Sequence, residues 1–138
     1  MEKRKFEELY IGQSVSLRQT ATDEYVVKMA ELTGDINPVH LDDEYAKASM
    51  FGQRIAHGLF CDGMVSCMLG TDLPGPGSIY LEKHIQFRAP VFLGDEIEGT
   101  LCITEINEEK RRVNLSFECT KTDGTIVARG EVLMKMQT

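Results

Sequence analysis

The chain has 138 residues, of which 42% are hydrophobic and 27% are charged, a balance typical of a soluble globular protein. This length favours a single domain over residues 1–138, with a core large enough to need no disulfide staples. The formal net charge is −7 and no run of basic residues is present. We therefore expect neither nucleic acid nor an anionic membrane as a partner.

The cysteines indicate a reducing compartment. They form no C-x-x-C pair and lie in apolar segments, so the sequence predicts reduced core residues instead of disulfides or a zinc site. The N-terminal residues contain no apolar stretch of signal-peptide length, and nowhere do 18 apolar residues run together. These features favour a cytoplasmic protein. The four cysteines are Cys61, Cys67, Cys102 and Cys119.

The N-terminal half of the chain mixes one strand with helices. Residues 15–20 are compatible with a strand, and Thr22 is placed to cap a helix over residues 23–32. That helix is expected to end near Gly34, because Asn37 precedes a proline and is biased toward extended or turn geometry. Residues 58–69 are apolar on nearly every side, which predicts a helix buried all round.

The C-terminal half alternates between apolar and polar residues with a period of two, which predicts four half-buried strands. Asp123-Gly124 predicts a two-residue hairpin, and residues 107–110 predict a short polar turn. The expected fold class is therefore α+β, with a curved antiparallel sheet wrapped around one central buried helix. The apolar positions expected to face the core are Ile79, Leu81, Ile85, Phe87 and Ala89; Ile97, Leu101 and Ile103; Val113, Leu115, Phe117 and Cys119; and Ile126, Ala128, Val132, Met134 and Met136.

Asp35 and His40 lie on either side of Asn37-Pro38, which predicts that both occupy a loop where a tight turn brings their side chains together. A carboxylate beside an imidazole can perform general acid/base chemistry. The alternative is that Asp35 caps a turn while His40 sits on a solvated loop. His84 points to the opposite face of its strand from its apolar neighbours, and we assign it no chemistry.

His57-Gly58 leads directly into the helix expected over residues 58–69. The Gly58 N–H would be an unpaired donor at the positive end of the helix dipole, suited to a carbonyl that gains negative charge. The alternative is an ordinary helix entry in which His57 is hydrogen-bonded within the core. Asp35, His40 and His57 have the composition of a two-histidine, one-carboxylate metal triad, but their spacing matches no specific metal motif, so we predict no metal.

Several segments resemble the MaoC-like (R)-specific enoyl-CoA hydratases. The most specific are Gly34-Asp35-Ile36-Asn37-Pro38-Val39-His40 and the later Ala56-His57-Gly58, and the resemblance runs from about residue 8 to the end of the chain. It implies a hot-dog fold, a homodimer whose two sheets join into one, and a small-molecule acyl-CoA thioester bound in a tunnel near the protomer boundary. It also implies that Asp35 and His40 hold and activate one water, and that Gly58 donates to the thioester carbonyl.

Other positions of the motif have implied supporting roles. Asn37 and Pro38 shape the loop, and Ser66 matches a serine that relatives carry in the helix. Gly63 departs from the pattern, because relatives have a second serine there. The missing side chain either changes part of the substrate geometry or widens the acyl pocket. Ser66 is equally compatible with a helix hydroxyl that bonds its own backbone.

The resemblance implies a hydro-lyase that interconverts trans-2-enoyl-CoA and (R)-3-hydroxyacyl-CoA and requires no cofactor. The alternatives are an acyl-CoA thioesterase and a non-catalytic acyl-CoA-binding subunit, because the hot-dog fold does not fix one function. An anionic thioester also needs local positive charge. The candidates to meet its phosphates are Lys47, Arg54, Lys83 and Arg88.

Overall fold

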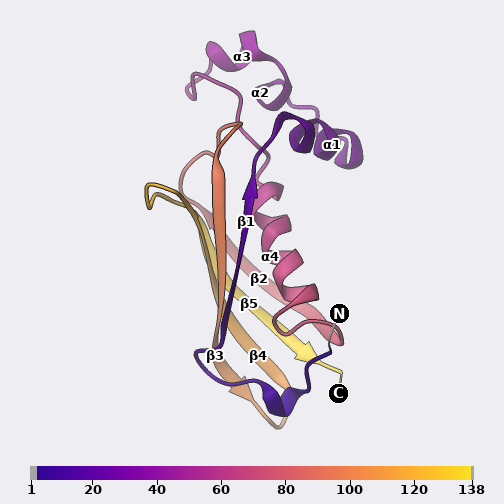
Figure 1. The fold of residues 1–138 in the computed structure, drawn as a ribbon. Helices are drawn as coiled ribbons and strands as arrows, with labels where there is room; N and C mark the ends of the chain where they lie inside the picture. The colour runs from indigo at the N-terminus through magenta and orange to yellow at the C-terminus, as the bar shows by residue number, and fades with distance from the viewer. Residues whose placement is uncertain (1–2, 138) are drawn as a thin grey trace.

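The computed structural model describes residues 3–137 and places a five-stranded antiparallel sheet against one long helix (Figure 1). The strand order is β1-β3-β4-β5-β2, so β1 and β2 form the two edges. Helix α4 lies along one face of the sheet, and α1, α2 and α3 gather beyond one end of it. The elements are η1 (Phe6–Glu8), β1 (Ser14–Thr20), α1 (Asp23–Thr33), α2 (Pro38–Leu41), α3 (Asp43–Lys47), α4 (Leu59–Thr71), β2 (Ser78–Phe87), β3 (Glu96–Asn107), β4 (Arg112–Lys121) and β5 (Ile126–Met136).

The predicted α+β class and the four antiparallel strands of the C-terminal half are confirmed, but only β3, β4 and β5 are neighbours in chain order, because β2 pairs with β5 and not with β3. Strands β3 and β4 alternate as expected, with Ile97, Leu101, Val113 and Leu115 fully buried against α4 and the rest of the core. The turn over residues 107–110 joins β3 to β4. The hairpin at Asp123-Gly124 is longer than predicted, because β4 ends at Lys121 and β5 begins at Ile126.

Strand β2 does not follow the predicted burial. Ile79, Leu81 and Phe87 were expected to face the core, but they are 39%, 41% and 56% exposed. The strand is at the sheet edge, and its register with β5 shifts between Tyr80 and Glu82, where one residue is left out of the pairing. Both features leave apolar side chains uncovered within a single chain.

Helix α4 is the central helix, yet the prediction that it is buried all round is wrong. One side packs into the core through Phe60, Met64 and Leu69, while Leu59, Ser66 and Cys67 are exposed along the other. The sheet covers only one side of the helix. The prediction of four core cysteines fails at Cys67 for the same reason, and it fails at Cys102 because this residue is half-buried on the other face of β3. All four cysteines are free thiols.

The local signals around α1 are confirmed. The Thr22 side chain accepts a hydrogen bond from the Tyr25 N–H at the start of the helix, and Gly34 ends it with a left-handed φ of 80°. The prediction that His40 lies on a loop is wrong, because His40 belongs to the short helix α2, which starts with Pro38 in its first turn. Within residues 3–137 no helix is both long enough and apolar enough to cross a bilayer.

Candidate active site

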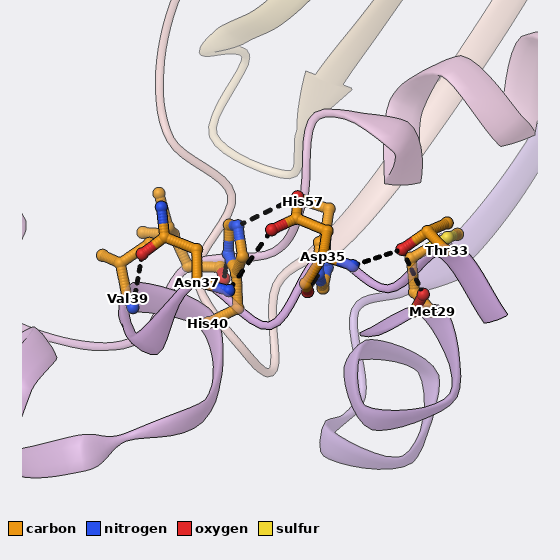
Figure 2. Close-up of polar contacts among 8 residues, drawn as sticks. Met29, Thr33, Asp35, Asn37, Val39, His40 and His57 are labelled. Atoms are coloured by element: carbon orange, nitrogen blue, oxygen red, sulfur yellow. Dashed lines mark hydrogen bonds and ion pairs between the residues drawn. The ribbon is translucent and has the colours of Figure 1, made fainter. Parts of the chain in front are cut away.

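The segment between α1 and α4 brings Asp35, His40 and His57 together, as Figure 2 shows. Asp35 follows the Gly34 cap, and its N–H donates to the Thr33 hydroxyl at 3.1 Å. Its carboxylate accepts from the Asn37 N–H at 3.3 Å. The Asp35 side chain is 47% exposed, whereas that of His40 is only 10% exposed. A partly solvated carboxylate therefore faces a nearly buried imidazole.

Backbone carbonyls determine the tautomers of both histidines. His40 Nδ1 lies 2.7 Å from the Ile55 carbonyl oxygen, and His57 Nε2 lies 3.0 Å from the Asp35 carbonyl oxygen. A carbonyl oxygen only accepts hydrogen bonds, so each of these nitrogens carries the hydrogen. In the neutral form, His40 Nε2 is then left with a lone pair, and this atom faces the Asp35 carboxylate.

His40 Nε2 and Asp35 Oδ2 are 4.0 Å apart, too far for a direct hydrogen bond. Two groups at this separation can each form a hydrogen bond of about 2.8 Å to one water oxygen, with about 90° between the two bonds. The arrangement therefore suits an imidazole base and a carboxylate that share one water between them.

His57 supports the pair from the side. Its ring stacks on that of His40, with the ring centroids 3.9 Å apart and an interplanar angle of 27°. The same ring holds the Asp35 backbone in place through the 3.0 Å hydrogen bond. His57 is 3% exposed, and its Nδ1 finds no hydrogen-bond partner among the described residues. The interpretation of His57 as a site-shaping residue fits these contacts.

Gly58 precedes the first residue of α4, where backbone N–H groups have no partner within the helix. A cavity of about 450 Å³ opens beside it, within the size range of small-molecule sites. Its lining includes His57, Gly58, Cys61, Phe87, Arg88 and Val127. The ring of Phe87 lies so close to Gly58 that a Cβ added there would meet it at 3.0 Å. The helix start thus offers a donor to a ligand in an apolar pocket.

Potential metal-ligating atoms of Asp35, His40 and His57 lie within 4.8 Å of one another. Two imidazoles and a carboxylate are a donor set that fits a divalent transition metal. The spacing in the chain had not indicated such a cluster. A metal bound there would occupy the lone pair of His40 Nε2, which is the same lone pair that would accept a hydrogen bond from the shared water. The cluster can therefore hold either a metal or the shared water at this atom, but not both.

The structure does not place Ser66 or Gly63 in contact with the acid/base pair. Ser66 is exposed on α4, and among the described residues its hydroxyl forms no hydrogen bond with Asp35 or His40. Gly63 faces α1, where a Cβ would meet the Tyr25 hydroxyl at 3.4 Å, an ordinary contact distance. The proposed roles of these two positions therefore stay predictions.

Arg54 was considered in the sequence as a phosphate contact, but the structure gives it a structural role. Its Nε donates to the His40 carbonyl at 2.7 Å, and its guanidinium pairs with Asp23 at 2.6 Å. Lys83 is also engaged, by Asp62. Among the four cations that the sequence offered, Lys47 and Arg88 remain exposed on the surface.

Changing Arg54 to glutamine is expected to lower the free energy of unfolding by about 1–3 kcal/mol, because the nearly buried charged hydrogen bonds are lost. It should also lower kcat severalfold with little change in KM, because the His40 carbonyl loses the hydrogen bond from Arg54 that holds this residue in place. Thermal denaturation and steady-state kinetics measure both effects. Lys47→Gln, an exposed cation on α3, is the matched control for stability. Equal unfolding curves for the two variants would contradict this role.

Known proteins are similar to this chain over most of its length. The model of the MaoC like domain matches residues 7–125. The chain is 43% identical to a 3-hydroxybutyryl-CoA dehydratase of Methylorubrum extorquens, covering 95% of this chain and 83% of that protein. It is 40% identical to an (R)-specific enoyl-CoA hydratase of Rhodospirillum rubrum, covering 91% of this chain and 87% of that protein.

A solved structure of the (R)-hydratase from Aeromonas caviae involved in PHA biosynthesis superposes with a TM-score of 0.91 at 34% identity. It covers 94% of this chain, and this chain covers 98% of it. The predicted hot-dog fold is confirmed by this match. Since the family model matches most of the chain and these relatives match over nearly their whole length, the chain belongs to the MaoC-like domain family.

Proposed function

We propose that this protein is an (R)-specific enoyl-CoA hydratase that adds water reversibly to trans-2-enoyl-CoA and thus also acts as a 3-hydroxyacyl-CoA dehydratase. The observation that carries the proposal is the pair of His40 Nε2 and Asp35 Oδ2, 4.0 Å apart. Gly58, at the start of α4, directly follows His57, and the ring of His57 stacks on that of His40. The relatives named above, a 3-hydroxybutyryl-CoA dehydratase and an (R)-specific enoyl-CoA hydratase, support it.

The reaction makes three demands, and these residues can meet each of them. The His40–Asp35 pair takes a proton from the shared water as the water oxygen bonds to C3 of the enoyl chain. Electrons of the double bond move toward the thioester, and its carbonyl oxygen gains negative charge that the Gly58 N–H stabilises. The pair then returns a proton to C2, so that water is added across the double bond and the protein is unchanged.

The direct test is to mix the purified protein with crotonyl-CoA, follow the loss of the enoyl-thioester absorbance and determine the configuration of the product. We expect (R)-3-hydroxybutyryl-CoA. Release of free thiol, measured in the same sample, would instead indicate the thioesterase. Binding of butyryl-CoA without turnover of any enoyl-CoA would indicate a non-catalytic acyl-CoA-binding subunit.

The thiol that lines the cavity does not suit a thioesterase that uses a cysteine nucleophile. Cys61 is the thiol that lines it. The pKa of Cys61 is raised well above its usual value, first by its interaction with the Cys119 thiol and then by burial. Because the thiolate is the nucleophilic form, Cys61 stays protonated and inert at neutral pH.

We propose that catalysis requires no metal, because the acid/base pair and the Gly58 N–H supply all the chemistry named above. Dialysis against EDTA is expected to leave kcat within about twofold of the starting value, whereas added Zn²⁺ should inhibit by occupying the cluster of Asp35, His40 and His57. Elemental analysis of the dialysed sample is the control. Activity that disappears with the metal and returns with it would contradict the proposal.

We propose further that the protein is a homodimer joined through β2. This strand is a sheet edge, and Ile79, Tyr80, Leu81 and Phe87 are exposed along it. Such an edge is a template for pairing with a second copy. Sedimentation equilibrium should give a mass of about 31 kDa or a multiple of it, since one chain has 15.5 kDa. A species of one chain's mass at micromolar concentration would contradict the dimer.

A further inference from the structure

The segment that carries Asp35 has no regular structure of its own. Residues 34–37 lie between α1, which ends at Thr33, and α2, which begins at Pro38. Among the described residues the Asp35 backbone forms two hydrogen bonds. Its N–H donates to the Thr33 hydroxyl at 3.1 Å, and its carbonyl oxygen accepts from His57 Nε2 at 3.0 Å. These two bonds connect the backbone of Asp35 to the elements on either side of it.

The Thr33 hydroxyl is itself fixed to α1, as Figure 2 shows. It donates to the Met29 carbonyl oxygen, one turn earlier in the helix, at 2.6 Å. The hydroxyl therefore uses its single hydrogen within the helix and offers a lone pair to the Asp35 N–H. The bond to the helix carbonyl also selects one of the two χ1 rotamers open to a helical threonine. The oxygen that receives the Asp35 N–H is thus a fixed point of the last turn of α1.

The two members of the acid/base pair are held by different contacts. His40 belongs to α2, its side chain is 10% exposed, and its ring stacks on that of His57. The Asp35 side chain is 47% exposed, and its carboxylate accepts only from the Asn37 N–H, which lies in the same short segment. The position of Asp35 therefore depends on the bonds that Thr33 and His57 make to its backbone.

A second threonine shows which of these bonds is common to helix ends. Thr71 is the last residue of α4, as Thr33 is of α1, and its hydroxyl donates to the Cys67 carbonyl oxygen at 2.5 Å. Within residues 3–137 no backbone N–H donates to the Thr71 hydroxyl. The bond to the preceding turn thus occurs at both helix ends, and Thr33 makes the bond from Asp35 in addition.

We propose that Thr33 is a positioning residue for the reaction, whose hydroxyl fixes the Asp35 backbone so that the carboxylate and His40 share one water. This inference rests on the proposed function. Without the hydroxyl, solvent takes the Asp35 N–H, because both residues are exposed, but a solvent molecule is not fixed to α1. The carboxylate then occupies a range of positions, and fewer of them place the water for attack on C3.

The effect should fall on the chemical step and not on substrate binding. Among the described residues the lining of the cavity beside Gly58 includes no residue of α1. Thr33→Val keeps the β-branched shape and removes the hydroxyl. It should lower kcat for crotonyl-CoA hydration about tenfold with KM within about twofold, because the carboxylate is retained but placed less accurately. Thr33→Ser keeps the hydroxyl and should stay close to the wild-type kcat.

Thr71→Val is the matched control, because it removes the equivalent hydroxyl bond at the end of α4. It should leave kcat unchanged, and thermal denaturation should show that all three variants are folded. Wild-type kcat in folded Thr33→Val, an equal loss in Thr71→Val, or a loss in Thr33→Ser as large as in Thr33→Val would each overturn the inference.

A double-mutant cycle tests whether Thr33 acts through the carboxylate of Asp35. Thr33→Val should lower kcat in the wild-type background and have little further effect in Asp35→Asn, where no carboxylate remains to be placed. A purely structural role would give the same fold loss in both backgrounds. That result would overturn the inference.

Crystal structures keep this inference separable from the proposed function, because they require no catalysis. The separation of His40 Nε2 and Asp35 Oδ2, 4.0 Å in the wild-type protein, should be kept in Thr33→Ser. In Thr33→Val the carboxylate should move away from His40 or lose order. If no enoyl-CoA is hydrated but this difference occurs, the proposed function fails and the positioning of Asp35 by Thr33 stands. If crotonyl-CoA is hydrated and Thr33→Val matches the wild-type protein in kcat and structure, the inference fails alone.

Discussion

Asp35→Asn and His40→Gln should each lower kcat for crotonyl-CoA hydration by roughly 10²–10⁴, the usual contribution of a positioned acid or base. The first change removes the charge of the carboxylate while keeping its shape. The second replaces the imidazole, whose Nε2 lone pair faces Asp35 in the tautomer that the Ile55 carbonyl imposes. Steady-state kinetics at saturating substrate measure the loss.

His84→Gln is the matched control for the histidine change. His84 lies on β2 with 77% of its side chain exposed, and we assign it no part in the reaction. Circular dichroism and thermal denaturation should give the same fold for all three variants. Turnover close to that of the wild-type protein in both Asp35→Asn and His40→Gln would exclude the mechanism.

Gly58→Pro is expected to lower kcat by roughly 10²–10³, the range measured when one donor to a developing oxyanion is removed. Proline lacks the N–H, while the φ of −53° at Gly58 lies within the range that the proline ring imposes. The position is at the helix start, where the lost N–H has no partner within the helix. The substitution therefore targets the donor more than the fold.

Gly58→Ala is the matched control, because it keeps the N–H and adds only a Cβ. That Cβ would meet the far end of the Phe87 side chain at 3.0 Å, and a shift of a few tenths of an ångström in this ring relieves the contact. Its kcat should therefore fall by less than about tenfold. Equal losses in the alanine and proline variants would show that the side-chain contact, and not the N–H, is what matters at this position.

Local sequence signals located most of the elements around the site. Thr22 and Gly34 set the ends of α1 because a hydroxyl can accept a backbone N–H and because glycine adopts a positive φ at low cost. The alternation in β3 and β4 located the core face, since one side of these inner strands is covered by α4. The four-residue helix α2 was missed because it is too short to show a helical period, although Pro38 at its start was a usable signal.

Exposure on β2 and α4 did not follow from the sequence pattern. Ile79 and Phe87 have the apolar character of core residues, but the strand order places β2 at an edge. Cys67 occupies an apolar segment, but the sheet covers only the opposite side of its helix. A pattern of apolar residues shows which side chains avoid water, and it does not show whether another element of the same chain covers them.

The sequence by itself determined the α+β class, the position of α1, the inner strands and the pairing of Asp35 with His40, because caps, turns and alternation act over a few residues. Only the tertiary structure decided how that pair is held. His57 stacks on His40 from 17 positions away, and its ring bonds the Asp35 carbonyl, 22 positions away. Asp62 of α4 meets Lys83 of β2 although the two residues are 21 positions apart in the chain. These contacts depend on how the elements pack in three dimensions, which no short-range spacing in the chain encodes.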